Sequence, residues 1–260
     1  MTDPTRRNLL LGIGASVSTA ALGSTRLVQG ATQSRAQSNQ APRNSTQESN
    51  RTNKGRVRII HLSPDAPPVD VYINGTLLYQ NVTPFNTGSG YVDYKAGTHR
   101  VSFVPAGKGL EEAVIDTRVT IQANDYTLAA IGEVAGCTDT PLRLVQFTDD
   151  NSELEQNRAR LRLIHASPDA SQVDVTTAEE GRTLFENIEF GDGEYATLAA
   201  GDYTVSVGAK ESSCGGTNAH FPLTLRGRRI YTAFIEGYLT PDNEPADKSL
   251  VLALSPPVTP

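Results

Sequence analysis

Hydrophobic and polar positions alternate with a period of two along most of the chain beyond residue 55. Val57, Ile59 and His61 share one face of such a segment, and Val101 and Phe103 mark a later one. This period places every second side chain on the same face of a sheet and therefore predicts β-strands. No segment of ten or more residues carries a convincing helical stripe.

Turn signals separate these segments at short intervals. They are Asn74-Gly75, Ala96-Gly97, Pro105-Ala106-Gly107, Asn124-Asp125, Ala200-Gly201 and Arg226-Gly227. Gly, Pro, Asn and Asp favour the backbone angles of tight turns. About seven short strands in roughly 100 residues is typical of an antiparallel β-sandwich of immunoglobulin-like build.

The pattern occurs twice. RIIHLSPDA at residues 58–66 returns as RLIHASPDA at 162–170, an offset of 104 residues. The closing segments also correspond, with Leu142-Arg143-Leu144-Val145 aligned to Ser249-Leu250-Val251-Leu252. Such self-similarity indicates a duplicated unit. The sequence therefore predicts an all-β chain with two tandem sandwiches, repeat 1 at 56–148 and repeat 2 at 158–256, joined by a linker at 149–157.

Residues 1–30 have the features of a twin-arginine signal peptide. Arg6 and Arg7 precede Asn8 and three leucines, and an apolar stretch without acidic residues follows. The stretch is shorter than the roughly 20 residues of a membrane span, and no later run is longer, so we expect no membrane span in the mature form. Cleavage would leave an extracellular or cell-surface protein, whereas an uncleaved signal would act as an anchor.

Residues 31–55 predict a disordered polar tether, because they contain almost no large apolar side chains to bury. Four asparagines start N-glycosylation sequons in the tether and in repeat 1: Asn44, Asn50, Asn74 and Asn81. Such triplets also occur by chance, and Asn74-Gly75 has a structural use as a hairpin turn.

The charge distribution excludes one class of partner and suggests an environment. Residues 56–260 carry 16 basic and 27 acidic residues, a net charge of −11, with only four lysines. Nucleic acid is excluded because phosphate binding requires a basic surface. An acidic, lysine-poor surface suits high salt, where screening weakens self-repulsion, so a halophilic source is expected.

The duplicated His-x-Ser-Pro-Asp element is the natural place to look for chemistry. A nucleophilic triad needs Ser, His and a carboxylate that converge in space, whereas these residues follow one another at a strand end. Ser, Pro and Asp also suit a type I turn. On that interpretation His61 and His165 are partly buried and bond to local backbone or to Asp70 and Asp174, and there is no catalytic residue.

A metal site is the alternative interpretation of the repeated element. Six side chains are weak candidate ligands: His61, Asp65, Asp70, His165, Asp169 and Asp174. Their spacing is not characteristic of zinc, and no twelve-residue calcium loop is present. We therefore expect no metal and no cofactor.

Cys137 and Cys214 occupy non-equivalent places in the two repeats, so neither belongs to a repeated site. Two cysteines in an exported chain suggest one disulfide, which would link the repeats. Two free thiols are the alternative, because sequence alone does not show whether the sulfurs lie within reach.

The segments RVRIIHLSPDAPPVDVYINGTLLYQNV, YVDYKAGTHRVSFVPAG and YTLAAIGEV resemble the domain-of-unknown-function family 4397. The resemblance covers nearly all of residues 56–255, with the second copy departing around 176–180 and Cys214. It implies an exported β-sandwich module, often found in tandem, without an established activity.

Two classes of function follow from these observations. The favoured one is an exported, non-enzymatic cell-surface or secreted module for adhesion, envelope interaction or ligand binding, whose partner is a cell-envelope protein or glycan. The alternative is an exported hydrolase, or the accessory domain of one, that uses the duplicated His-x-Ser-Pro-Asp element. Only the repeated His, Ser and Asp motivate this second class.

Overall fold

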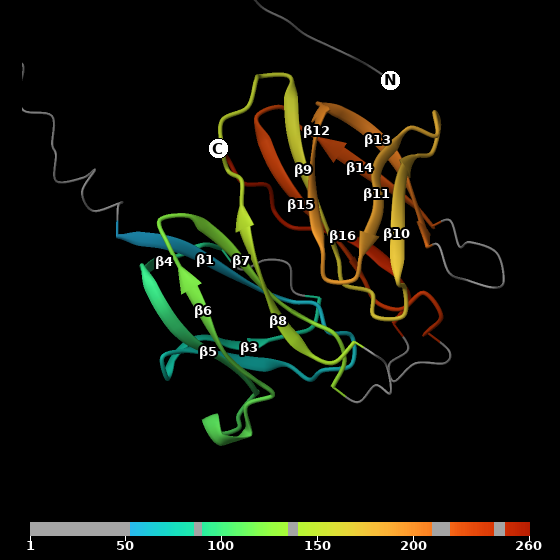
Figure 1. Ribbon diagram of the computed structural model, residues 1–260. Helices are drawn as coiled ribbons and strands as arrows, with labels where there is room; N and C mark the ends of the chain where they lie inside the picture. The colour runs from blue at the N-terminus through green and yellow to red at the C-terminus, as the bar shows by residue number, and fades with distance from the viewer. Residues whose placement is uncertain (1–52, 86–89, 135–139, 210–218, 242–247) are drawn as a thin grey trace, which may run out of the picture. The chain divides into compact units, whose positions relative to one another are not determined.

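The computed structural model describes residues 53–85, 90–134, 140–209, 219–241 and 248–260. These residues form sixteen strands and one short 3₁₀ helix, labelled in Figure 1. The elements are β1 (Lys54–His61), β2 (Val69–Ile73), β3 (Thr76–Val82), β4 (Val92–Lys95), β5 (Gly97–Pro105), η1 (Leu110–Glu112), β6 (Ile115–Ile121), β7 (Asp125–Ile131), β8 (Arg143–Asp149), β9 (Arg158–His165), β10 (Gln172–Thr177), β11 (Thr183–Glu189), β12 (Gly193–Ala199), β13 (Gly201–Ala209), β14 (Ala219–Leu225), β15 (Arg229–Glu236) and β16 (Val251–Leu254). None of the described helical segments is long and apolar enough to cross a membrane.

The strands form two β-sandwiches, each with two four-stranded sheets. The first sandwich has the strand orders β4-β1-β7-β8 and β3-β2-β5-β6, and the second has β12-β9-β15-β16 and β11-β10-β13-β14. The second sandwich thus repeats the strand order of the first, as the duplicated sequence predicts. Each has its own hydrophobic core, around Val71, Phe103 and Leu128 in the first and around Val175, Phe185 and Leu223 in the second.

The pairing directions differ from a purely antiparallel sandwich. Ten of the twelve strand pairings are antiparallel, but β1 pairs with β7, and β9 with β15, in parallel. Parallel neighbours need a crossover connection. Here the chain passes through the four strands of the other sheet, and through the edge strand β4 or β12 of the same sheet, between the two parallel strands. Each sandwich has eight strands rather than about seven, and the immunoglobulin-like relationship stays a prediction.

The strand ends shift the expected repeat boundaries by a few residues. Lys54 and Gly55, expected in the tether, already pair with β4. Asp149, expected as the first linker residue, ends β8 and pairs with Asp125. At the other end, Val258 exchanges backbone hydrogen bonds of 2.8 and 3.0 Å with Ile230, so strand-like pairing continues beyond residue 256.

The closing strands correspond one residue away from the expected alignment. Arg143 lies opposite Ile131, and Val251 lies opposite Glu236, so Arg143 is equivalent to Val251 and not to Leu250. The segments between the paired strands differ in length, and sequence gives no anchor within them. A one-residue slip exchanges the two faces of a strand, so this correction decides which side chains face inward.

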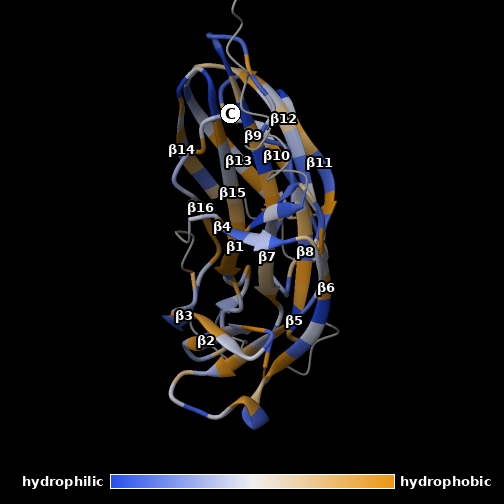
Figure 2. Ribbon diagram, turned by 90° about the vertical axis from the view of Figure 1, so that its left-hand side faces the viewer, coloured by the Kyte–Doolittle hydropathy of each residue, from blue (hydrophilic) through white to orange (hydrophobic). Residues whose placement is uncertain are grey.

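A third hydrophobic cluster joins the two sandwiches through the sheets that contain β1 and β9. Its buried members are Ile60, Leu62, Ala129, Ile131, Phe147, Ile164, Ala166 and Phe234. The central strands of these sheets are therefore buried on both faces, whereas β6 alternates between buried and exposed positions. Figure 2 shows β7 and β15 as largely hydrophobic, with hydrophilic segments along β6. Both sandwiches belong to one compact unit, Asn44–Pro260.

Candidate functional site at the junction of the sandwiches

The two histidines of the repeated element are buried at the ends of β1 and β9. Their exposed fractions are 1% for His61 and 0% for His165. His61 Nε2 lies 3.2 Å from the carbonyl oxygen of Pro67, and His165 Nε2 lies 2.9 Å from that of Ala170. Burial lowers the pKa of His61, and it lowers the pKa of His165 from 6.5 to about 4. The expected bonding to local backbone is confirmed, but both rings are fully buried rather than partly buried, because the strands that carry them are covered on both faces.

The Ser and Asp of the element hold a neighbouring loop. Ser63 Oγ donates to Asp65 Oδ1 at 3.1 Å, and Asp65 accepts the backbone N–H of Val134 at 2.9 and 3.0 Å. In the second sandwich, Asp169 accepts the backbone N–H groups of Leu239 and Thr240, both at 2.8 Å. The carboxylates therefore fix the chain just beyond β7 and β15. These carboxylates bind loops that are distant in sequence, so the sequence of the element alone does not predict the contact.

Asp70 and Asp174 face a different feature of each sandwich. Each accepts a backbone N–H at 2.7 Å, from Asn81 and Asn187 respectively. Both asparagines have positive φ, 55° and 57°, at irregularities in the strand pairing. The six candidate ligands thus serve separate backbone contacts. In the described part of the chain, no three His, Cys, Asp or Glu side chains converge as metal ligands would.

Asn74 and Asn81, the two candidate glycosylation sites within the described residues, are both exposed. Asn74 and Gly75 have φ of 51° and 78°, which confirms the predicted hairpin turn. The Asn74 side chain also contacts His99 Nδ1 at 2.9 Å and accepts the backbone N–H of Arg100 at 3.0 Å. The remaining candidate positions lie outside the described residues: Arg6, Arg7, Asn44, Asn50, Cys137 and Cys214.

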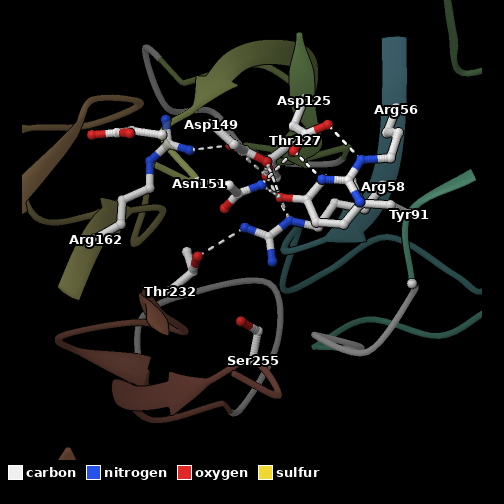
Figure 3. Close-up of polar contacts among 12 residues, drawn as sticks. Arg56, Arg58, Tyr91, Asp125, Thr127, Asp149, Asn151, Arg162, Thr232 and Ser255 are labelled. Carbon is white, nitrogen blue, oxygen red and sulfur yellow. Dashed lines mark hydrogen bonds and ion pairs between the residues drawn. The ribbon is translucent and has the colours of Figure 1, made fainter. Parts of the chain in front are cut away.

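A buried charged network occupies the junction between the sandwiches (Figure 3). Arg58 of β1 and Arg162 of β9 stand at equivalent positions, and their side chains are 5% and 3% exposed. Asp149 at the end of β8 reaches both. Arg162 Nη1 donates to Asp149 Oδ1 at 2.5 Å, and Arg58 Nε lies 3.6 Å from Asp149 Oδ2. One carboxylate from the first sandwich thus contacts guanidinium groups of both.

Hydroxyl groups and rings complete the network. Arg58 donates to Thr127 Oγ1 at 2.7 Å and to Thr232 Oγ1 at 2.8 Å, which ties the first sandwich to β15 of the second. Tyr91 donates its hydroxyl to Asp149 at 2.5 Å, and burial raises its pKa. The Arg162 guanidinium stacks 4.9 Å from the ring centroid of Tyr195. Charge-assisted hydrogen bonds of this kind are about twice as strong as neutral ones.

The network opens into a polar groove of about 710 Å³. Its lining consists mostly of polar side chains: Lys54, Arg56, Asp93, Asn124, Asp125, Asp149, Asn151 and Thr259. Arg56 forms an ion pair with Asp125 at its wall. Burial opposes ionisation of Asp125, but hydrogen bonds from Arg56 and Asn151 hold the pKa of this carboxyl below its ordinary value. The groove offers paired donors and acceptors, which suit a polar ligand.

Sequence reasoning missed this network, although one signal was present. An arginine stands within the apolar run of both β1 and β9, at the same position of the repeat. A charged side chain in such a strand is rarely buried unless it is paired. The partner, Asp149, is far from Arg58 in sequence, lies 13 residues before Arg162, and has no equivalent carboxylate in the second repeat.

Comparison with known families matches residues 55–176 to the family described as domain of unknown function (DUF4397). This segment belongs to the DUF4397 family. The matched DUF4397 segment runs from β1 into β10 and so includes both His-x-Ser-Pro-Asp turns. No curated protein sequence matches the chain.

Among solved structures, the chain is similar to one titled "The Bacillus anthracis TIE protein", with 11% sequence identity and a TM-score of 0.24. The alignment covers 72% of this chain and 34% of that one, so the chain spans about a third of its length. A likeness at this level carries no argument about the fold or function of the DUF4397 segment.

Proposed function

We propose that the protein is an exported, non-enzymatic module that acts at the cell surface or in the medium by binding an envelope glycan or protein. The twin-arginine sequence at Arg6-Arg7 supports export. The net charge of −11 over residues 56–260 supports a salt-rich environment. The two packed sandwiches provide one compact unit for binding.

Burial of the repeated element is the observation that carries this proposal. Ser63 and Ser167 are 0% exposed, and each donates its hydroxyl to the aspartate two residues on. A nucleophile must reach a substrate and lose its proton to a nearby base. The burial and bonding of both serines support a non-enzymatic module, and we take the polar groove at the junction as the proposed contact surface.

Cell fractionation tests export. The wild-type chain is expected in the envelope or the medium, and the double variant Arg6→Lys with Arg7→Lys is expected to remain inside the cell. A hydrolase screen of the exported protein tests whether the module is non-enzymatic. Activity present in the wild type and absent in His61→Ala and His165→Ala variants of native stability would overturn the non-enzymatic assignment.

Binding is tested with purified cell envelope in a pull-down. Asp93→Ala and Asn151→Ala change the groove lining and are expected to reduce retention several-fold. Asp202→Ala, at an exposed position of the second sandwich outside the groove, is the matched control. Equal retention of all variants would remove the groove from the proposed function.

A further inference from the structure

The junction network is asymmetric at two equivalent positions. Thr127 lies opposite Phe147 in the first sandwich, and its counterpart Thr232 accepts the backbone N–H of Ser255 at 2.9 Å in the second. Ser255 therefore stands where the first sandwich has Phe147. Two residues further on, Pro257 stands where the first sandwich has Asp149. The second sandwich thus lacks both the ring and the carboxylate.

This asymmetry leaves two buried guanidinium groups beside one buried carboxylate. Arg58 and Arg162 share Asp149, while Asp125 pairs with Arg56 and has a smaller Coulombic attraction to Arg58. The side chains of Arg58, Arg162 and Asp149 are at most 5% exposed. Removing an uncompensated guanidinium from water costs several kcal/mol, so buried charges normally have a counter-charge.

The environment of Arg58 shows where a counter-charge fits. Its Nε and Nη2 have hydroxyl partners, whereas Nη1 has no acceptor among the described residues and is not one of their fully buried unpartnered atoms, so it keeps access to solvent. In Figure 3 this third nitrogen points to the side on which Ser255 lies. Ser255 is 3% exposed, and its hydroxyl has only a long contact of 3.4 Å, to the carbonyl oxygen of Pro256.

The two arginines also differ in the number of aromatic rings that lie against their guanidinium groups. The Arg162 guanidinium lies 4.5 Å from the Phe147 centroid and 4.9 Å from that of Tyr195. Arg58 has Tyr91 at 5.2 Å but no second aromatic ring in the described residues. The position that would supply that ring is Ser255, a small hydroxyl donor.

We propose that a small monovalent anion, of which chloride is the probe, binds at the junction between the Arg58 guanidinium and the Ser255 hydroxyl. The anion balances the excess charge and accepts hydrogen bonds from both groups. It acts as a counter-charge to Arg58, as the carboxylate of Asp149 does to Arg162. The site stabilises the contact between the sandwiches and does not depend on the proposed function.

Thermal unfolding of the full chain at constant ionic strength tests the site. Replacing sodium gluconate by sodium chloride is expected to raise the melting midpoint by about 3 °C once chloride is roughly tenfold above its dissociation constant. Constant ionic strength separates binding from screening, which acts on all surface charges alike. Equal midpoints in the two salts would show that water, not an anion, occupies the space, and would overturn the proposal.

Two variants and one localisation make the test specific. Ser255→Phe restores the residue of the first sandwich and Ser255→Ala removes only the hydroxyl, so both are expected to lose most of the chloride effect. Ser206→Ala, a buried serine of the outer β13, should retain it. Bromide soaked into crystals should give an anomalous peak beside Arg58. A peak beside Arg162 instead, whose Nε is buried without a partner, contradicts the assignment.

Discussion

The two sandwiches agree in strand order and in their His-x-Ser-Pro-Asp turns, but they differ where they face each other. At the junction, the first sandwich has Phe147 and Asp149 where the second has Ser255 and Pro257. Near the other end of β7 and β15, Ile131 of the first corresponds to Glu236 of the second. The shared turns serve the folding of each sandwich, whereas the unshared Phe147 and Asp149 serve the contact between the two.

Asp149 makes the strongest test of this comparison, because it has no counterpart. Asp149→Ala leaves two buried guanidinium groups without a carboxylate, so we expect a loss of about 3–5 kcal/mol in the free energy of unfolding. Denaturant titration measures it. The neighbouring Asp150→Ala breaks only a half-exposed pair with Arg160 and should change stability by less than about 1 kcal/mol. Similar losses from both variants would mean that the network does not hold the junction.

Glu236 is the second unshared group, and it should make the protein less stable as pH rises. Burial raises the pKa of its carboxyl from 4.5 to about 8, against an opposing effect of Lys248, and Oε2 is buried without a partner. The unfolded chain releases this proton near pH 4.5, whereas the folded chain keeps it until about pH 8. Its unfavourable effect is therefore absent at low pH and grows through that window.

Replacing Glu236 by its counterpart tests this expectation. Glu236→Ile should raise stability by about 3 kcal/mol at pH 8 and by much less at pH 4.5. Denaturant unfolding across this pH range is the measurement. The exposed Glu186→Gln serves as the control and should leave the pH profile unchanged. A gain that is the same at both pH values would show that packing, and not ionisation, explains it.

Each sandwich contains one buried histidine of the repeated element. In contrast to Glu236, these histidines should make the protein less stable as pH falls. Because burial lowers the pKa of His165 from 6.5 to about 4, the unfolded chain takes up a proton as pH falls below 6.5 while the folded chain resists it. His165 should therefore reduce stability by about 2 kcal/mol by pH 5. His165→Gln should reduce this loss of stability between pH 6.5 and pH 5 in denaturant titrations. The variant His220→Gln, at an exposed histidine, should not reduce it. A loss that persists in His165→Gln would be assigned to other groups.

The sequence predicted features that depend on local pattern and missed those that depend on distant partners. The Asn74-Gly75 turn and the strands around Val57 and Phe103 follow from local chemistry and alternation. The parallel pairing of β1 with β7 joins segments about 70 residues apart, and no local signal encodes it. The adjacent Ile59 and Ile60 were assigned to an alternating strand, although such apolar runs also indicate burial on both faces.

The candidate site was harder to predict for the same reason. The repeat drew attention to His61 and His165, whose rings bond to local backbone, and away from the arginines three residues earlier in the same strands. The decisive partner, Asp149, lay in the expected linker. Its burial depends on how two sandwiches pack, and the pattern of a single strand does not contain that information.

The smallest expected effect lies at the two carboxylates that the repeat makes equivalent. Asp65 accepts the backbone N–H of Val134 beyond β7, and Asp169 accepts that of its counterpart Leu239 beyond β15. Asp65→Ala and Asp169→Ala should each cost about 1 kcal/mol in the free energy of unfolding, because each variant leaves backbone donors without their carboxylate. Denaturant titration of the two variants compares the losses. A loss confined to one variant would mean that the two turns, despite their shared sequence, do not perform the same task.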